Sequence, residues 1–183
     1  PRDWRSKQQA ESVDARDLRR EFQKGVELHL RSDFTVGVTL SGGVDSSSLA
    51  AAARECVGQG AIPSFSYIAD DPALSEERYI DLVADKLNLN PFKTSPGPDD
   101  LAKDLDQLVR VQGEPFGSLS IYAQYKVFEL VRRQGVKAVL GGQGADELFA
   151  GYRGHLAARL GDMISSGRLL AAHGFLDSVR EPD

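Results

Sequence analysis

Apolar and polar residues follow two different spacings along the chain, and the spacings alternate from one segment to the next. In residues 15–31, apolar side chains recur about every four positions, which is the spacing of one face of an α-helix. Residues 34–40, FTVGVTL, are instead a short run of β-branched and apolar residues, which is typical of a buried strand. The same reasoning predicts helices over 46–57, 75–88, 98–111 and 119–134, and strands over 62–69, 91–94 and 136–140.

The order of these elements predicts the fold class. Strands alternate with helices, which indicates an α/β domain with a parallel, twisted sheet and helices on both faces, a three-layer Rossmann-like arrangement. In such sheets, ligands bind at the carboxyl ends of the strands. The glycine-rich segments 41–43 and 141–144 follow two predicted strands. We therefore expect the functional site where these two segments lie.

The segment SGGVDSS, residues 41–47, has the composition of a phosphate cradle. Gly42 and Gly43 allow a sharp turn with backbone amides exposed, and the helix that follows adds its unpaired N–H groups and the positive end of its dipole. The hydroxyls of Ser41, Ser46 and Ser47 are further candidate donors. The common G-x-x-x-x-G-K-[ST] loop is absent. Residues 41–47 contain no lysine to pair with phosphate, and their one charged residue is Asp45. A carboxylate among phosphates predicts a divalent cation between them, and Mg²⁺ is usually held in this way.

The second glycine-rich segment, GGQGADELFAGY at 141–152, does not fit a dinucleotide fingerprint. The third glycine of G-x-G-x-x-G would fall at position 147, which is Glu147. Asp146, an acidic residue beside a glycine-rich strand end, is predicted to be functional. Glu147 is either a ligand or base, or a residue that only favours the start of the following helix.

Composition restricts the partners further. The 183 residues carry 27 acidic and 22 basic side chains, so there is no basic field for nucleic acid. No apolar stretch approaches the roughly 20 residues needed to cross a bilayer, and no signal peptide is visible, so we expect a cytoplasmic protein without membrane contact. The three histidines are far apart and give no zinc pattern. The single cysteine, Cys56, is expected to lie in the core.

These motifs together resemble a known family. SGGVDSS resembles the pyrophosphate-binding loop of the ATP pyrophosphatases (the PP-loop, adenine nucleotide alpha hydrolase-like group), and GGQGADELFAGY resembles the second signature of the asparagine synthetases and their β-lactam synthetase relatives. EPFGSLSIYAQY, at 114–125, resembles the segment between the two. The three segments keep the family's order over roughly residues 15–155.

The resemblance implies a two-step ligase reaction of amino-acid biosynthesis. Mg-ATP adenylates a carboxylate, of aspartate or a similar acceptor, with release of pyrophosphate, and ammonia then displaces AMP to form an amide. It implies that residues 41–47 hold the departing phosphates and that Asp45 and Asp146 share Mg²⁺. The backbone at Leu40, Ile68, Gly141 and Gly142 would line the nucleotide pocket, and Asp45, Asp146, Gln143 and Glu147 would be the catalytic set.

The chain departs from the family at one informative position. Asparagine synthetases often carry glutamate where Gln143 stands, and an amide cannot accept a proton as a carboxylate can. The acceptor therefore stays open, and a β-lactam or other amide-forming synthetase is an alternative. Ser118 and Ser120 would lie near the acceptor, although Glu114 and Pro115 fit a simple helix start equally well.

The resemblance also sets expectations about organisation. Residues 1–14 are a run-in, and 15–183 are part of a synthetase domain, with the family's N-terminal glutaminase module and C-terminal helices not included. A glutaminase domain would supply ammonia in the full-length protein, and the oligomeric state, with a homodimer as one arrangement, stays open. An alternative from another functional class is a non-catalytic module that binds adenine nucleotides. Asp45 and Asp146 argue against it, because a module that only binds nucleotide has little need of two carboxylates that hold a metal ion.

Overall fold

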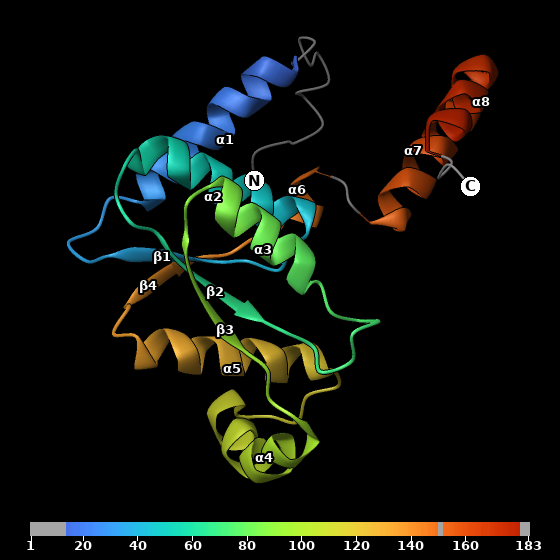
Figure 1. Ribbon diagram of the computed structural model, residues 1–183. Helices are drawn as coiled ribbons and strands as arrows, with labels where there is room; N and C mark the ends of the chain where they lie inside the picture. The colour runs from blue at the N-terminus through green and yellow to red at the C-terminus, as the bar shows by residue number, and fades with distance from the viewer. Residues whose placement is uncertain (1–13, 150–151, 180–183) are drawn as a thin grey trace. The chain divides into compact units, whose positions relative to one another are not determined.

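The computed structural model describes residues 14–149 and 152–179 and divides the chain into two compact units, Pro1–Gly141 and Gly142–Asp183. The first unit contains a four-stranded parallel sheet in the order β3-β2-β1-β4 (Figure 1). Its strands are β1 (Val36–Thr39), β2 (Pro63–Tyr67), β3 (Asn90–Thr94) and β4 (Ala138–Leu140). The predicted α/β class with a parallel sheet is therefore confirmed.

Five helices of the first unit cover the two faces of this sheet. They are α1 (Ala15–His29), α2 (Val44–Val57), α3 (Glu77–Lys86), α4 (Pro98–Gln112) and α5 (Leu119–Arg133). In Figure 1, α1, α2 and α3 lie on one side of the sheet, and α5, with α4 beyond it, lies on the other. Each predicted element of this unit is present, with its ends within two residues of the predicted ones.

The two faces of the sheet bury different cores. Under α1, α2 and α3, buried aliphatic residues pack together, among them Val38, Leu40, Ala50, Ala53 and Ile80. Alanines on α2 keep that helix close to the sheet, because they add little bulk between the two backbones. Under α5, the ring of Phe65 stacks on Phe92, with 5.4 Å between ring centroids, and packs against Val127 and Val131.

One prediction about this core is wrong. Cys56 was expected to be buried because it belongs to the alanine-rich helix, yet its side chain is exposed. It lies in the last turn of α2, beyond the buried Ala52 and Ala53. Its thiol accepts a hydrogen bond from the Gln23 amide, with 3.2 Å between Nε2 and Sγ.

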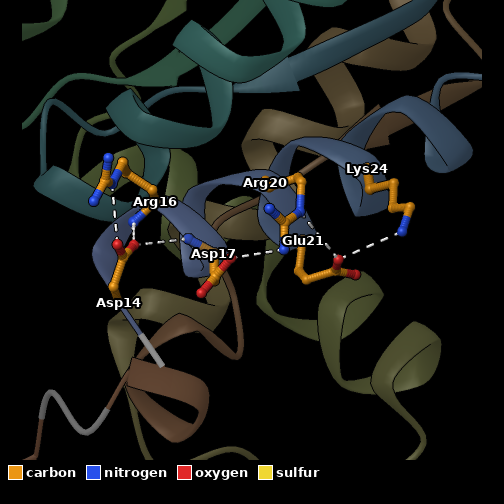
Figure 2. Close-up of polar contacts among 6 residues, drawn as sticks. All are labelled: Asp14, Arg16, Asp17, Arg20, Glu21 and Lys24. Atoms are coloured by element: carbon orange, nitrogen blue, oxygen red, sulfur yellow. Dashed lines mark hydrogen bonds and ion pairs between the residues drawn. The ribbon is translucent and has the colours of Figure 1, made fainter. Parts of the chain in front are cut away.

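Helix α1 begins at a capped end and carries its charges toward solvent. The Asp14 carboxylate accepts hydrogen bonds from the backbone N–H groups of Arg16 and Asp17, which holds the pKa of Asp14 below its usual value. Figure 2 shows this cap together with ion pairs along the helix, namely Asp14–Arg16, Asp17–Arg20 and Glu21–Lys24. These pairs are exposed, so they contribute little to stability.

Two charged side chains connect elements inside the first unit. Arg54 of α2 donates to the carbonyls of Leu87 (2.7 Å) and Asn88 (2.6 Å), just after α3, and to those of Gly58 and Gly60. Lys93 of β3 pairs with Glu77 and Asp81 of α3. These contacts hold α3 against both α2 and the edge of the sheet.

The second unit is helical. It contains α6 (Ala145–Phe149), α7 (Arg153–Ser165) and α8 (Leu169–Ser178), and α7 packs against α8. The sequence pattern did not predict α7 or α8. No helix in the described part of the chain has the length and apolar character needed to cross a bilayer.

Candidate nucleotide-binding site

The loop that carries the first motif begins where β1 ends. Leu40 is only 2% exposed, and its N–H donates to the carbonyl of Phe65 on β2 at 2.9 Å. The chain is therefore fixed by the core and by the sheet up to the residue before Ser41. Residues 41–43 then turn into α2, whose N-cap is Gly43.

Gly42 is required by the shape of this turn. Its φ of +82° is disfavoured for residues with a side chain. A Cβ at this position would also lie 3.0 Å from Cβ of Tyr79 and 3.3 Å from the carbonyl oxygen of Glu76. The loop thus packs against the start of α3 at a point where only hydrogen fits.

The hydroxyl of Ser46 holds the loop together. This side chain is buried, with 6% exposure. Its Oγ accepts from the backbone N–H of Ser41 at 3.2 Å, lies 3.0 Å from Ser41 Oγ, and donates to the carbonyl of Gly43 at 3.2 Å. Ser46 is predicted from the sequence as a donor to a ligand, and in this structure its hydroxyl forms hydrogen bonds within the loop.

The start of α2 leaves donors for an anion. No side chain caps this helix end among the described residues, so the amides of its first turn are available. The Ser47 hydroxyl is buried in the same turn and, within the described part of the chain, has no hydrogen-bond partner. Asp45, also in the first turn, is exposed. This donor set fits a polyanion, and the nearby carboxylate fits a hard divalent cation.

The second motif starts beside the first. β4 pairs in parallel with β1, with Val38 opposite Leu140, so the two strands end at the same edge of the sheet. A Cβ on Gly141 would lie 2.9 Å from Oγ1 of Thr39. Gly141 therefore allows the chain to leave β4 directly over the end of β1. This adjacency of the two strand ends is what the positions of the glycine-rich segments predicted.

The rest of the second motif belongs to the second unit. Gly144 has a φ of +91° and precedes α6, and Asp146 and Glu147 lie in the first turn of that helix. Gln143 is exposed. Asp45 belongs to the first unit and Asp146 to the second, so the shared Mg²⁺ stays a prediction. Among the described residues, no group of three or more acidic, histidine or cysteine side chains forms a metal cluster.

Glu147 has a partner that the sequence analysis missed. The Tyr152 hydroxyl donates to Oε1 of Glu147 at 2.7 Å, which lowers the pKa of Glu147 and raises that of Tyr152. The rings of Tyr152 and His155 pack in a T-shaped arrangement, with 5.5 Å between ring centroids. A five-residue separation is not a usual helical pairing, so only the presence of a tyrosine in DELFAGY hinted at this contact.

The remaining predicted positions have structural partners. The N–H of Ile68 donates to the carbonyl of Thr94 at 2.8 Å, which continues the sheet just past β2. Ser118 is the N-cap of α5 and accepts from the N–H of Ser120 at 3.2 Å. The interpretation of EPFGS as a helix start therefore describes what Ser118 does in this structure.

Comparisons with known proteins agree with these motifs. The family model "Asparagine synthase" matches residues 17–180. A putative glutamine-hydrolyzing asparagine synthetase 2 of Methanocaldococcus jannaschii is 35% identical over 139 residues, which are 76% of this chain and 27% of that protein. Glutamine-hydrolyzing asparagine synthetase 1 of Bacillus subtilis is 29% identical over 75% of this chain and 21% of its own length.

A fungal protein and a solved structure extend the comparison. Amidase chyE of Penicillium rubens is 29% identical over 74% of this chain and 22% of its own length. The solved structure is that of the NH3-dependent NAD synthetase of Campylobacter jejuni with a nitrate ion, and it matches this chain with a TM-score of 0.52 at 16% identity. The match covers 76% of this chain and 61% of that chain, and it shows a shared fold. The chain spans about a quarter of the length of its curated relatives. The match to the family model over most of its length shows that this chain belongs to the asparagine synthase family.

Proposed function

We propose that this chain is the ATP-binding part of an amide-forming synthetase that adenylates a carboxylate, releases pyrophosphate, and forms an amide with ammonia. The observation that carries the proposal is the uncapped start of α2 behind a turn that requires glycine at position 42. Such a helix start is suited to phosphate groups, because its amides and dipole both favour negative charge. Membership of the asparagine synthase family favours ATP as the anion and a carboxylate as the acceptor.

The roles of the residues follow from their positions. The first-turn amides of residues 44–46 would bind the β- and γ-phosphates, and the buried Ser47 hydroxyl would add a donor. Ser46 would act indirectly, because its three contacts keep the turn in shape before any ligand arrives. Asp45 would hold Mg²⁺, which supplies charge neutralisation for the departing pyrophosphate. Asp146 is assigned to the same ion by family resemblance.

The acceptor and the ammonia source are also proposals. Relatives of this chain are named glutamine-hydrolyzing, which supports a glutaminase domain as the source of ammonia. The Gln143 side chain cannot accept a proton, which favours a carboxylate acceptor whose activation needs no base at that position. A β-lactam or other amide-forming reaction is therefore a candidate in addition to amide formation on aspartate.

Binding of ATP with and without magnesium tests the site directly. ATP should bind more tightly in the presence of Mg²⁺, and Asp45→Asn should remove most of that difference while leaving the chain folded. Asp33→Asn is the matched control, because Asp33 is also exposed but precedes β1, at the opposite end of the strand. The parent chain and Asp45→Asn are each measured with and without magnesium. Equal ATP affinity in these four measurements would refute the assignment of Asp45 to the metal.

The products of the reaction test the bond that is broken. Because the loop is proposed to hold the leaving diphosphate, labelled ATP and an acceptor should yield AMP and pyrophosphate. Formation of ADP and phosphate would contradict the pyrophosphatase assignment, even if ATP binds at residues 41–47.

A further inference from the structure

A cavity lies beside α4, away from both motifs in sequence. The loop that follows α4 contributes to its lining, the cavity is open to solvent, and its volume is about 490 Å³, within the range of small-molecule sites. Its lining residues all come from α4 and this loop, and they are Leu105, Asp106, Val109, Arg110, Pro115 and Phe116. None of them belongs to residues 41–47 or 141–147, so the cavity is separate from the proposed ATP loop.

The lining combines apolar walls with one pair of opposite charges. Four of the six side chains are apolar, and the other two are Asp106 and Arg110, one helical turn apart. In the described part of the chain, neither of these charged side chains takes part in an ion pair or side-chain hydrogen bond. Both therefore have their full binding capacity available to a ligand in the cavity.

A polar clamp fixes the corner that contains the cavity. Asp104 of α4 accepts hydrogen bonds from the Tyr122 hydroxyl at 3.0 Å and from Lys126 Nζ at 2.9 Å, both on α5. The side chain of Lys126 is only 12% exposed, and its ammonium also contacts Glu129 at 2.5 Å. Every lining residue lies between Asp104 and Tyr122 in sequence, so the clamp closes the segment that forms the cavity. The clamp restrains the segment that lines the cavity, which reduces the entropic cost of binding there.

We propose that this cavity binds a free α-amino acid with an apolar side chain. Its ammonium group would pair with Asp106, and its carboxylate would receive the planar guanidinium of Arg110. Its side chain would contact Leu105, Val109 and Phe116. A zwitterion can pair with both of these exposed charges, whereas a ligand with one charge can pair with only one of them. This inference does not depend on the proposed synthetase activity.

The test is an NMR titration of the ¹⁵N-labelled chain with L-leucine. Saturable shifts are expected for amides in 105–116, with a dissociation constant on the order of 1 mM, as expected for a small ligand. Two analogues separate the charges: 4-methylpentanoate lacks the ammonium group, and isopentylamine lacks the carboxylate. Each should bind about tenfold more weakly, because each loses one charged hydrogen-bonding group.

Variants test the two charged residues separately. Asp106→Asn and Arg110→Gln should each weaken leucine binding about tenfold. Asp99→Asn on α4 and Arg132→Gln on α5 are matched controls outside the lining and should bind leucine as the parent chain does. All four positions are exposed, so circular dichroism should show unchanged folding.

Several results would overturn the proposal. These are the absence of saturable shifts in 105–116, equal binding of either analogue, and unchanged affinity in both charge variants. Tighter binding of L-aspartate than of L-leucine would also overturn it, because the apolar walls would then not be selecting the side chain. Loss of ATP binding has no bearing on any of these readings, so failure of the two proposals can be told apart.

Discussion

Replacing Gly42 by alanine should destabilise the fold far more than the same change one residue later. An alanine at position 42 must adopt a φ near +82°, and its Cβ would lie 3.0 Å from Cβ of Tyr79. At Gly43 the φ is −71°, and the nearest atom to a new Cβ is Ser41 Oγ at 3.4 Å. The two variants therefore add the same methyl group to the same loop and differ only in strain and space.

The magnitudes follow from these two differences. A left-handed conformation costs a residue with a side chain about 1–2 kcal/mol, and forcing a methyl group against fixed backbone adds about 1–3 kcal/mol. A less flexible unfolded chain offsets up to about 1 kcal/mol of this, which leaves a net loss of about 1–5 kcal/mol for Gly42→Ala. For Gly43→Ala we expect a loss below about 0.5 kcal/mol, because the poorer N-cap costs about 0.5–1 kcal/mol and the less flexible unfolded chain offsets most of it.

Urea unfolding of the parent chain and both variants, followed by circular dichroism, measures these losses. ATP affinity of the two variants, measured under conditions where both are folded, shows whether the turn itself matters for binding. Equal stability of the two variants would refute the argument that the turn is defined by backbone strain and by the contact with α3. A Gly42→Ala chain that binds ATP as tightly as the parent would refute the requirement for a close approach at this position.

Three further predictions concern stability and use the same unfolding assay. Ser64→Ala should raise stability by up to about 1 kcal/mol, because the Ser64 hydroxyl is fully buried and has no partner among the described residues; a loss would contradict this reasoning. Arg54→Lys should lower it by about 1–2 kcal/mol, because lysine keeps the charge but cannot reach four carbonyls with a planar fork; faster amide exchange at the end of α3 should accompany the loss. The hydrogen bond from Lys126 holds the pKa of Asp104 below its usual value of 3.8. Its contribution should therefore be present above pH 3.8 and be lost as the pH falls through the folded pKa, and Lys126→Met should reduce this acid-dependent loss.

The sequence predicted the sheet and its helices well because each element has a clear period. The β1 run FTVGVTL and the four-residue spacing of apolar side chains in α1 leave little choice of structure. Helix α7 was missed although Leu156, Leu160 and Met163 have helical spacing, because Gly154 and Gly161 argue against a helix interior. Tertiary packing with α8 outweighed the low helix propensity of these glycines.

The predicted site was less complete than the fold for a physical reason. Residue type identifies Ser46 as a hydroxyl donor, but only the three-dimensional turn shows that its partners are Ser41 and Gly43. Likewise, the alanine-rich composition of α2 says nothing about where the helix passes beyond the core, which is why Cys56 is exposed. Backbone turns and strand ends could be predicted, whereas the partner of each polar side chain depends on contacts between distant segments.

The strand order also has a consequence for the sequence of folding events. Val36 of β1 pairs with Ala138 of β4, about 100 positions later in the chain, whereas β1, β2 and β3 follow one another within residues 36–94. Loop closure costs more entropy for the longer separation, and a ribosome releases the N-terminal strands first. We therefore expect β1, β2 and β3 to associate before β4 docks. The corner at which Gly141 passes over Thr39 would then form late, so slow steps in refolding should be sensitive to Gly141→Ala and insensitive to changes on the opposite edge at β3.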